Sequence, residues 1–422
     1  MTDRIARWHS SAGIIGGSLI VLVGATASLY AAEPTGLALT GLHTFDREVT
    51  SLMNKWEIPG GSLAVAYKGR LVLARGYGLS DRASKTPAQP TTLYRLGSLA
   101  KPITAVATLQ LMEDGRLNLD DPILPILGDM APPENTFADT RVKSITIRHL
   151  LQHRMGVDRE RSGDPVFMPG NAAAAARQQA SMPATCLTLL RDGLQRHQDF
   201  TPGERHAYSN VGYCMLGRII EKVSGETYDA FVQAHIFAPV GVRGFLLART
   251  LETAPGEATY YDYPGAKLVD AMPGVATEKV SRPYGHYSME SMDSFGGWLG
   301  SPVEFLKFFL TIDGQRGTSL LKEATQRQML ARPIGEEKSA AYYALGFRVR
   351  PVKDGTNWWH GGSQPGATAF AVRTAQSYAW VVAFNMRPRD QNKFLSELDA
   401  TLWRAANAVK NWPVGDLFAQ FP

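Results

Sequence analysis

The sequence lacks the motifs of several large enzyme classes. It contains no phosphate-binding loop and no dinucleotide fingerprint, so we expect no nucleotide cofactor. His149 and His153 lie four residues apart, as in some zinc sites, but no glutamate follows His149, so we expect no metal there. We therefore expect neither a metal nor an organic cofactor.

Charged residues are few. They make up 20% of the 422 residues, the net charge is +5, and no run of lysine and arginine stands out. A mild surplus spread over the chain lacks the basic stripe of a nucleic-acid-binding protein and permits only weak attraction to anionic surfaces. Hydrophobic residues make up 44% of the chain. This balance indicates a soluble globular enzyme of one large domain or two intertwined domains.

Only one long apolar run is present, and it lies near the N-terminus. Two arginines precede the apolar residues 12–24, and Ala-Thr-Ala at 25–27 is a small-x-small cleavage pattern. This order predicts a cleaved signal peptide over residues 1–32. The alternative is an uncleaved membrane anchor, because the run is just long enough to cross a bilayer. Either a signal peptide or an anchor would place the catalytic part in a periplasmic or extracellular space. A lipoprotein would have a cysteine directly after the apolar run, and none is present there.

The first chemical motif is Ser98-Leu-Ala-Lys101, at the start of a predicted helix that ends near Gly115. Ser98 is a good N-cap residue, and apolar residues follow it at helical spacing. Residues three apart share a helix face, so the Lys101 amine can reach the Ser98 hydroxyl. A lysine in a dry pocket has a lowered pKa and can take the proton that a serine nucleophile must lose.

The same spacing also arises by chance. Ser319-Leu-Leu-Lys322 repeats it, and we interpret that copy as an ordinary helix start. No Gly-x-Ser-x-Gly pattern surrounds Ser98, which excludes an α/β-hydrolase. Ser98 and Lys101 therefore need further motifs before they indicate catalysis.

Two later stretches supply those motifs. Tyr208-Ser-Asn210 follows a Pro-Gly pair, and His360-Gly361-Gly362 follows two tryptophans. In this order the three motifs resemble those of the penicillin-recognising serine hydrolases, above all the group of class C β-lactamases, D-Ala carboxypeptidases and family VIII esterases. The similarity extends from the predicted helix near Phe45 to the C-terminal helix and includes the Gly-Gly-Trp298 region.

The resemblance implies a role for each motif residue. Ser98 would form an acyl-enzyme, with Lys101 and Tyr208 sharing the proton transfers. Asn210 would orient Lys101 or the substrate amide. The oxyanion hole would combine the backbone N–H groups of Ser98 and Ser363.

The third motif departs from the β-lactamase pattern. The family usually has Lys-Thr-Gly or Lys-Ser-Gly there, whose cation and hydroxyl grip a substrate carboxylate. His360 is mostly neutral near pH 7, and Gly361 has no hydroxyl, although Gly361 and Gly362 let the strand approach a substrate closely. The sequence therefore favours an esterase, amidase or peptidase that acts on a small ester, amide or peptide.

Two alternatives stay open. A true β-lactamase or D-alanyl-D-alanine carboxypeptidase requires a cation near His360, such as Arg348 or Arg373. A catalytically inactive, envelope-binding homologue would have kept the fold without the chemistry, and an exposed Lys101 would support it. The oligomeric state is not indicated by the sequence.

Strand patterns lie at both ends of the chain, with helices between them. A helix over 36–56 precedes two strands, a polar loop follows at 81–92, and a long helix closes the chain. This predicts an α+β fold with an antiparallel sheet flanked by helices, formed by 33–115 plus 301–422, and a mainly helical domain inserted at 116–300. The resemblance implies the same β-lactamase-like fold, with the site in the cleft between the domains.

The two cysteines, Cys186 and Cys214, lie on either side of the Tyr208 motif. An oxidising compartment would allow them to pair, and the resemblance implies a disulfide that clamps the segment carrying Tyr208. The alternative is a pair of buried thiols.

Overall fold

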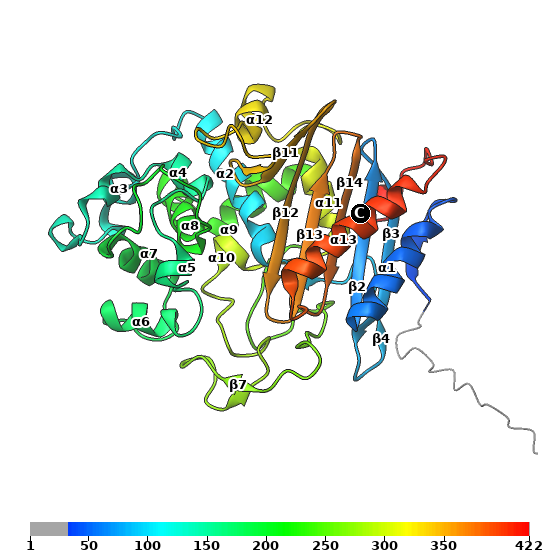
Figure 1. Ribbon diagram of the computed structural model, residues 1–422, viewed down its shortest axis with the longest axis horizontal. Coiled ribbons are helices and arrows are strands. Elements are labelled where there is room, and N and C mark those ends of the chain that lie inside the picture. Colours follow the sequence, from blue (N-terminus) through cyan, green and yellow to red (C-terminus); the bar gives the residue numbers. More distant parts are fainter. Residues whose placement is uncertain (1–32, 422) are drawn as a thin grey trace, which may run out of the picture.

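One antiparallel sheet organises the computed structural model, which describes residues 33–421; the predicted signal or anchor at 1–32 lies outside them. The sheet has nine strands in the order β1-β3-β2-β14-β13-β12-β11-β10, with β4 paired to β3 (Figure 1). The strands are β1 (Thr35–Ala38), β2 (Gly60–Tyr67), β3 (Arg70–Asp81), β4 (Thr86–Pro87), β10 (Tyr342–Tyr343), β11 (Arg348–Val352), β12 (Gly355–Gln364), β13 (Ala367–Arg373) and β14 (Tyr378–Phe384). The N-terminal and C-terminal strands meet where β2 pairs with β14.

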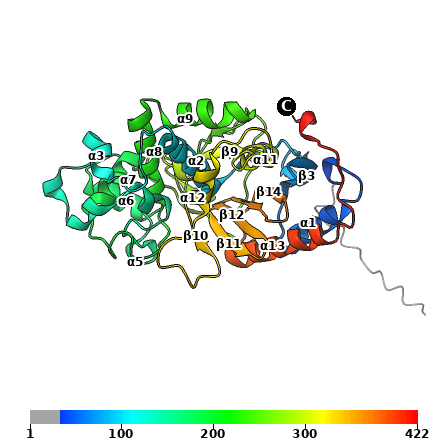
Figure 2. The same cartoon turned by 90° about the horizontal axis from the view of Figure 1, so that it is seen from above.

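Helices α1 (His43–Trp56) and α13 (Gln391–Asn407) lie side by side over one face of the sheet (Figures 1 and 2). Each presents apolar residues at helical spacing to a shared core, which includes Phe45, Val49, Phe394, Leu398 and Leu402. Burial of each such side chain contributes about 1.5–3 kcal/mol. This is why the last helix of the chain packs on the first.

Helix α2 (Ala100–Glu113) lies on the opposite side of the sheet from α1, where α11 (Pro302–Thr311) also packs. Eleven of its fourteen residues are buried, so α2 has no solvent-facing stripe and lies within the core. It contacts α8 (Asn210–Ser224) and α10 (Asp293–Gly296). Ser98 lies in the turn just before α2, Lys101 lies within α2, and Asn210 is the first residue of α8.

Most of the remaining helices gather beside the sheet, on the left of Figure 1. They are α3 (Ile123–Leu127), α4 (Ile147–Leu151), α5 (Arg159–Ser162), α6 (Gly170–Arg177), α7 (Cys186–Gln195) and α9 (Tyr228–Phe231), with α12 (Glu323–Leu330) later in the chain. Short strands β5 (Tyr94–Arg95), β9 (Trp298–Gly300) and β6 (Leu246–Leu247) form one small sheet, and β7 (Val269–Asp270) pairs with β8 (Lys279–Val280). Among residues 33–421, no helix combines the length and apolarity needed to cross a membrane.

The predicted fold class, an antiparallel sheet flanked by helices, is confirmed, but three local predictions are wrong. Residues Thr35–Ala38 form β1 on the edge of β3 instead of helix, because Gly36 and Gly41 have φ of +78° and +93°, outside the helical region. The predicted loop after β3 contains β4. Ser98 is not an N-cap, since it lies in a 3₁₀ turn and Leu99 precedes α2.

The division of the chain into 33–115 plus 301–422 and an inserted 116–300 stays a prediction. The structure joins Cys186 at the start of α7 to Cys214 in α8 by a disulfide, with the two Cα atoms 5.7 Å apart. The bond ties together two helices on either side of the Tyr208 motif.

Reduction of this disulfide should lower the free energy of unfolding by about 3.5 kcal/mol, because the bond closes a loop of 28 residues in the unfolded chain. Urea unfolding with and without a thiol reductant measures the difference. The variant Cys186→Ala/Cys214→Ala is the control and should not respond to reductant. Equal transitions for oxidised and reduced wild-type protein would contradict the prediction.

Candidate active site

The turn before α2 packs directly against strand β12. Gly97 has a φ of +53°, and a Cβ on it would lie 2.9 Å from the amide nitrogen of Ser363. A Cβ on Gly362 would lie 1.9 Å from the carbonyl oxygen of Leu96. Both positions therefore require glycine, and the close approach places the backbone of Ser98 next to that of Ser363.

Ser98, Lys101, Tyr208 and Asn210 form one hydrogen-bonded group. The Tyr208 hydroxyl donates to Ser98 Oγ at 2.8 Å, and Lys101 Nζ lies 3.2 Å from the same oxygen. Lys101 Nζ donates to Asn210 Oδ1 and to the carbonyl oxygen of Phe295, both at 2.8 Å. The structure therefore brings together the Ser-x-x-Lys and Tyr-x-Asn motifs, which are 110 residues apart.

Burial controls the protonation of this group. It lowers the pKa of Lys101 well below the usual lysine value; the Asp164 carboxylate opposes this shift, and Arg159 reinforces it. Burial also raises the pKa of Tyr208, although the hydrogen bond with Ser98 and the charge of Arg159 act in the opposite direction. Burial therefore favours the neutral amine of Lys101 and the protonated phenol of Tyr208.

Asp164 belongs to the site, and sequence reasoning missed it. Its carboxylate accepts from Asn210 Nδ2 at 2.7 Å, which turns the amide oxygen of Asn210 toward Lys101. Asp164 lies in the irregular segment after α5, which carries no motif. The only signal in the sequence was that such a polar loop can line a cleft.

His360 is part of the cleft wall but has no free polar atom. The imidazole accepts from the Tyr343 hydroxyl at Nε2 (2.9 Å) and donates from Nδ1 to the carbonyl oxygen of Gly361 (2.8 Å). Burial lowers the pKa of His360 to about 3, so the ring is neutral. His360 therefore cannot act as the carboxylate-binding cation of the Lys-Thr-Gly pattern.

Of the two arginines considered as replacements for that cation, only Arg348 faces the cleft. Arg348 and His360 line the same wall, and the charge of Arg348 helps to lower the pKa of His360. Arg373 is buried elsewhere, with Nη2 3.1 Å from the carboxylate of Asp313.

A cleft of about 1440 Å³ opens at Ser98. Tyr208, His360, Gly361 and Ser363 line it with Ser98, while Lys101 and Asn210 are buried beneath it. Phe167, Trp359 and Leu395 add apolar surface. Such a concave site with convergent polar groups suits a small molecule or a segment of a larger one.

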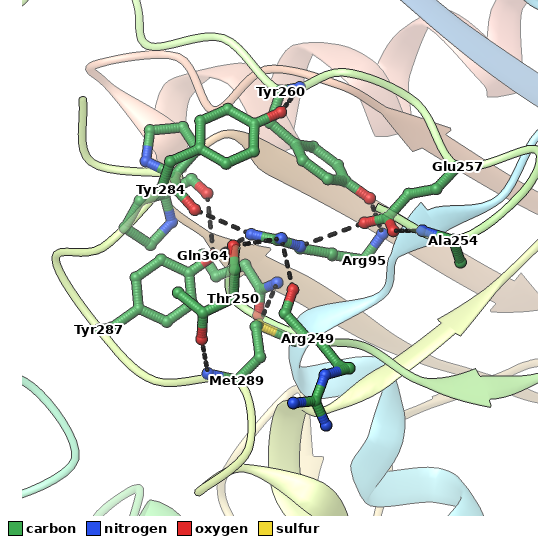
Figure 3. Close-up of polar contacts among 12 residues, drawn as sticks. Arg95, Arg249, Thr250, Ala254, Glu257, Tyr260, Tyr284, Tyr287, Met289 and Gln364 are labelled. Carbon is green, nitrogen blue, oxygen red and sulfur yellow. Dashed lines mark hydrogen bonds and ion pairs between the residues drawn. The ribbon is translucent and has the colours of Figure 1, made fainter. Parts of the chain in front are cut away.

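A buried arginine, Arg95, lies three residues before Ser98 and is hydrogen-bonded to loops between residues 249 and 287 (Figure 3). Arg95 and Glu257 are both 1% exposed and form an ion pair at 3.3 Å. The remaining guanidinium donors of Arg95 reach the oxygens of Arg249, Thr250, Pro283 and Tyr287. Sequence reasoning missed Arg95 because its partners lie more than 150 residues away.

Two other sequence features have no place in the site. Across residues 33–421, no group of three or more histidine, cysteine or acidic side chains could hold a metal ion. The second Ser-x-x-Lys copy lies before α12, where Lys322 is the residue preceding the helix and Ser319 Oγ donates to the carbonyl oxygen of Ile312.

Comparison with known proteins identifies a family over most of the chain. A family model described as Beta-lactamase matches residues 45–400. Protein flp of Staphylococcus aureus (strain MW2) is 24% identical over 351 residues, which cover 83% of this chain and 64% of that protein. The chain thus spans less than two thirds of the length of that relative.

Two solved structures share the fold. EstCE1, a hydrolase with promiscuous acyltransferase activity, has a TM-score of 0.66 at 20% identity, covering 86% of this chain and 99% of that one. The D-amino acid amidase from Ochrobactrum anthropi SV3, complexed with D-phenylalanine, has a TM-score of 0.65 at 22% identity, covering 87% and 99%.

Replacing Arg95 should test its structural role. Arg95→Met leaves Glu257 buried without a cation and should cost about 3–5 kcal/mol of folding free energy. Chemical denaturation measures the loss. The double variant Arg95→Met/Glu257→Gln should recover part of it, and a single variant as stable as wild type would contradict the role.

Proposed function

Because the chain belongs to the β-lactamase family of serine hydrolases, we propose that it cleaves an ester or amide bond through an acyl-enzyme on Ser98. One observation carries the proposal: Ser98 Oγ lies 2.8 Å from the Tyr208 hydroxyl and 3.2 Å from Lys101 Nζ. A serine between a proton donor and a buried amine is a nucleophile with its general base in place.

Lys101 is the proton acceptor in this proposal. A neutral amine has two hydrogens, and the two carbonyl-type oxygens of Asn210 and Phe295 accept them at 2.8 Å. The lone pair then points to Ser98, whose hydroxyl proton it takes as Oγ attacks the substrate carbonyl carbon. Tyr208, with its raised pKa, enters the reaction as a phenol and serves as the proton donor in the shared proton transfers.

The remaining steps use the same atoms. The backbone N–H groups of Ser98 and Ser363 donate to the oxyanion of the tetrahedral intermediate. The Tyr208 hydroxyl protonates the leaving oxygen or nitrogen, and the proton held by Lys101 restores the phenol. Water then attacks the acyl carbon and gives a proton to Lys101. The bond between the acyl carbon and Ser98 Oγ breaks, Lys101 returns the proton to Oγ, and the acid leaves.

A β-lactamase or D-alanyl-D-alanine carboxypeptidase activity is the second candidate. It is favoured by Arg348, which supplies a cation in the wall that contains His360. A catalytically inactive homologue is disfavoured, because Lys101 is fully buried and hydrogen-bonded to Ser98, Asn210 and Phe295. Hydrolysis of a penicillin and of a D-Ala-D-Ala peptide by the purified protein separates these activities.

We place the protein in a periplasmic or extracellular space. The disulfide Cys186–Cys214 supports this location, since such bonds persist in oxidising compartments. The predicted signal or anchor at residues 1–32, and any membrane association through it, stay predictions.

The nucleophile is tested with residues 33–422 and a short p-nitrophenyl ester. Ser98→Ala should lower kcat/KM on the order of 10⁴-fold, because no other hydroxyl replaces Oγ. Ser319→Ala, in the second Ser-x-x-Lys copy, is the matched control and should keep the wild-type rate. Equal rates for Ser98→Ala and wild type would overturn the assignment.

The base is tested by its pH dependence. The Asp164 carboxylate raises the pKa of Lys101, so Asp164→Asn should lower that pKa further while still accepting from Asn210. The neutral amine then prevails at lower pH, and the acid limb of the kcat/KM profile should move to lower pH. A shift of this limb to higher pH, or none, would contradict Lys101 as the base.

A further inference from the structure

The cleft at Ser98 is strongly cationic. Seven lysines and arginines line it against two carboxylates, those of Asp390 and Asp399. The local excess of five positive charges equals the net charge of the whole chain, +5. The sequence suggested a surplus spread along the chain, whereas the fold gathers cations from distant segments at one place.

Two of these cations have acidic neighbours outside the cleft lining, since Arg159 pairs with Glu160 and Arg282 with Asp262. The other five have no ion pair within 4.0 Å among residues 33–421. We name these exposed residues the cationic wall: Arg348, Arg350, Arg387, Arg389 and Lys393. They come from β11 and from the segment that leads from β14 into α13.

Local structure disfavours two of these charges. Arg389 and Lys393 flank Asp390, the N-cap of α13, where the helix dipole favours anions and disfavours cations. Like charges in one cleft repel one another, and the carboxylates of Asp390 and Asp399 offset only two of the seven positive charges. The remaining surplus disfavours the free protein, and an anionic ligand would reverse that effect.

The cationic wall is connected to the proposed catalytic group. Arg387 Nε donates to Ser363 Oγ at 2.8 Å, and Ser363 supplies one of the proposed oxyanion donors. Arg350 lies over the ring of Trp359, 5.2 Å from the ring centroid. Trp359 is on β12, the strand that also carries Ser363. A ligand on the wall would therefore extend from the neighbourhood of Ser98.

We propose that the cationic wall binds a substrate with several negative charges, phosphate or carboxylate groups, next to the bond that Ser98 attacks. This rests on the proposed function. One carboxylate would use one or two cations, whereas five are unpaired here. The cleft of about 1440 Å³ also exceeds the roughly 300–1,000 Å³ of ordinary small-molecule sites. An extended anionic molecule fits both observations.

The proposal is tested by calorimetric binding of inorganic tripolyphosphate and of hexa-L-glutamate to the Ser98→Ala protein at low salt. Saturable binding of at least one is expected, and the tighter of the two identifies phosphate or carboxylate as the preferred group. Arg389→Gln/Lys393→Gln in the same background should weaken that binding about tenfold, since two charge contacts are lost.

The matched control is Arg47→Gln/Arg327→Gln, which removes two exposed cations outside the cleft lining and should change binding less than twofold. No saturable binding of either anion, or equal weakening in both double variants, would overturn the proposal. Because Ser98→Ala cannot form the acyl-enzyme, this result is separate from ester hydrolysis. A wild-type protein without hydrolysis overturns the proposed function, and absent anion binding overturns only the substrate class.

Discussion

The enclosure of one lysine amine is the constraint on which the site depends. Lys101 is fully buried, and an ammonium ion there would lose its hydration without a carboxylate in direct contact. The neutral amine avoids that cost only if both of its hydrogens are accepted. Helix α8 provides the side chain of Asn210 and helix α10 provides the carbonyl oxygen of Phe295, so the packing of α2 against these helices creates the base.

The site also requires that strand β12 packs closely and rigidly against the turn that carries Ser98. Gly97 and Gly362 remove the two Cβ atoms that would separate Ser98 from β12. Arg95 adds rigidity from the other side, because its guanidinium holds the loops around residues 249–287 to the strand that leads into Ser98. Preorganised donors of this kind are what stabilise a developing oxyanion.

The sequence identified those site residues that are neighbours in the chain or that belong to motifs in a characteristic order. Ser98 and Lys101 share one turn, and the order of the three motifs indicated the family and the antiparallel sheet. It could not identify Asp164 or Arg95, since each acts through partners from distant segments. Arg348 was named as a candidate cation, but the fold was needed to show that the other four residues of the cationic wall line the same cleft. The strand β1 was missed for a related reason: Thr35–Ala38 is too short to show an alternating pattern, and its pairing with β3 determines its conformation.

The most direct test of the account is the mass of the protein during turnover. The enzyme is mixed with an activated ester, quenched in acid, digested and analysed by mass spectrometry. We expect one acyl group on the peptide that contains Ser98, and none on that peptide in the Ser98→Ala protein. An acyl group found only on another residue, or hydrolysis without any acylated peptide, would contradict it.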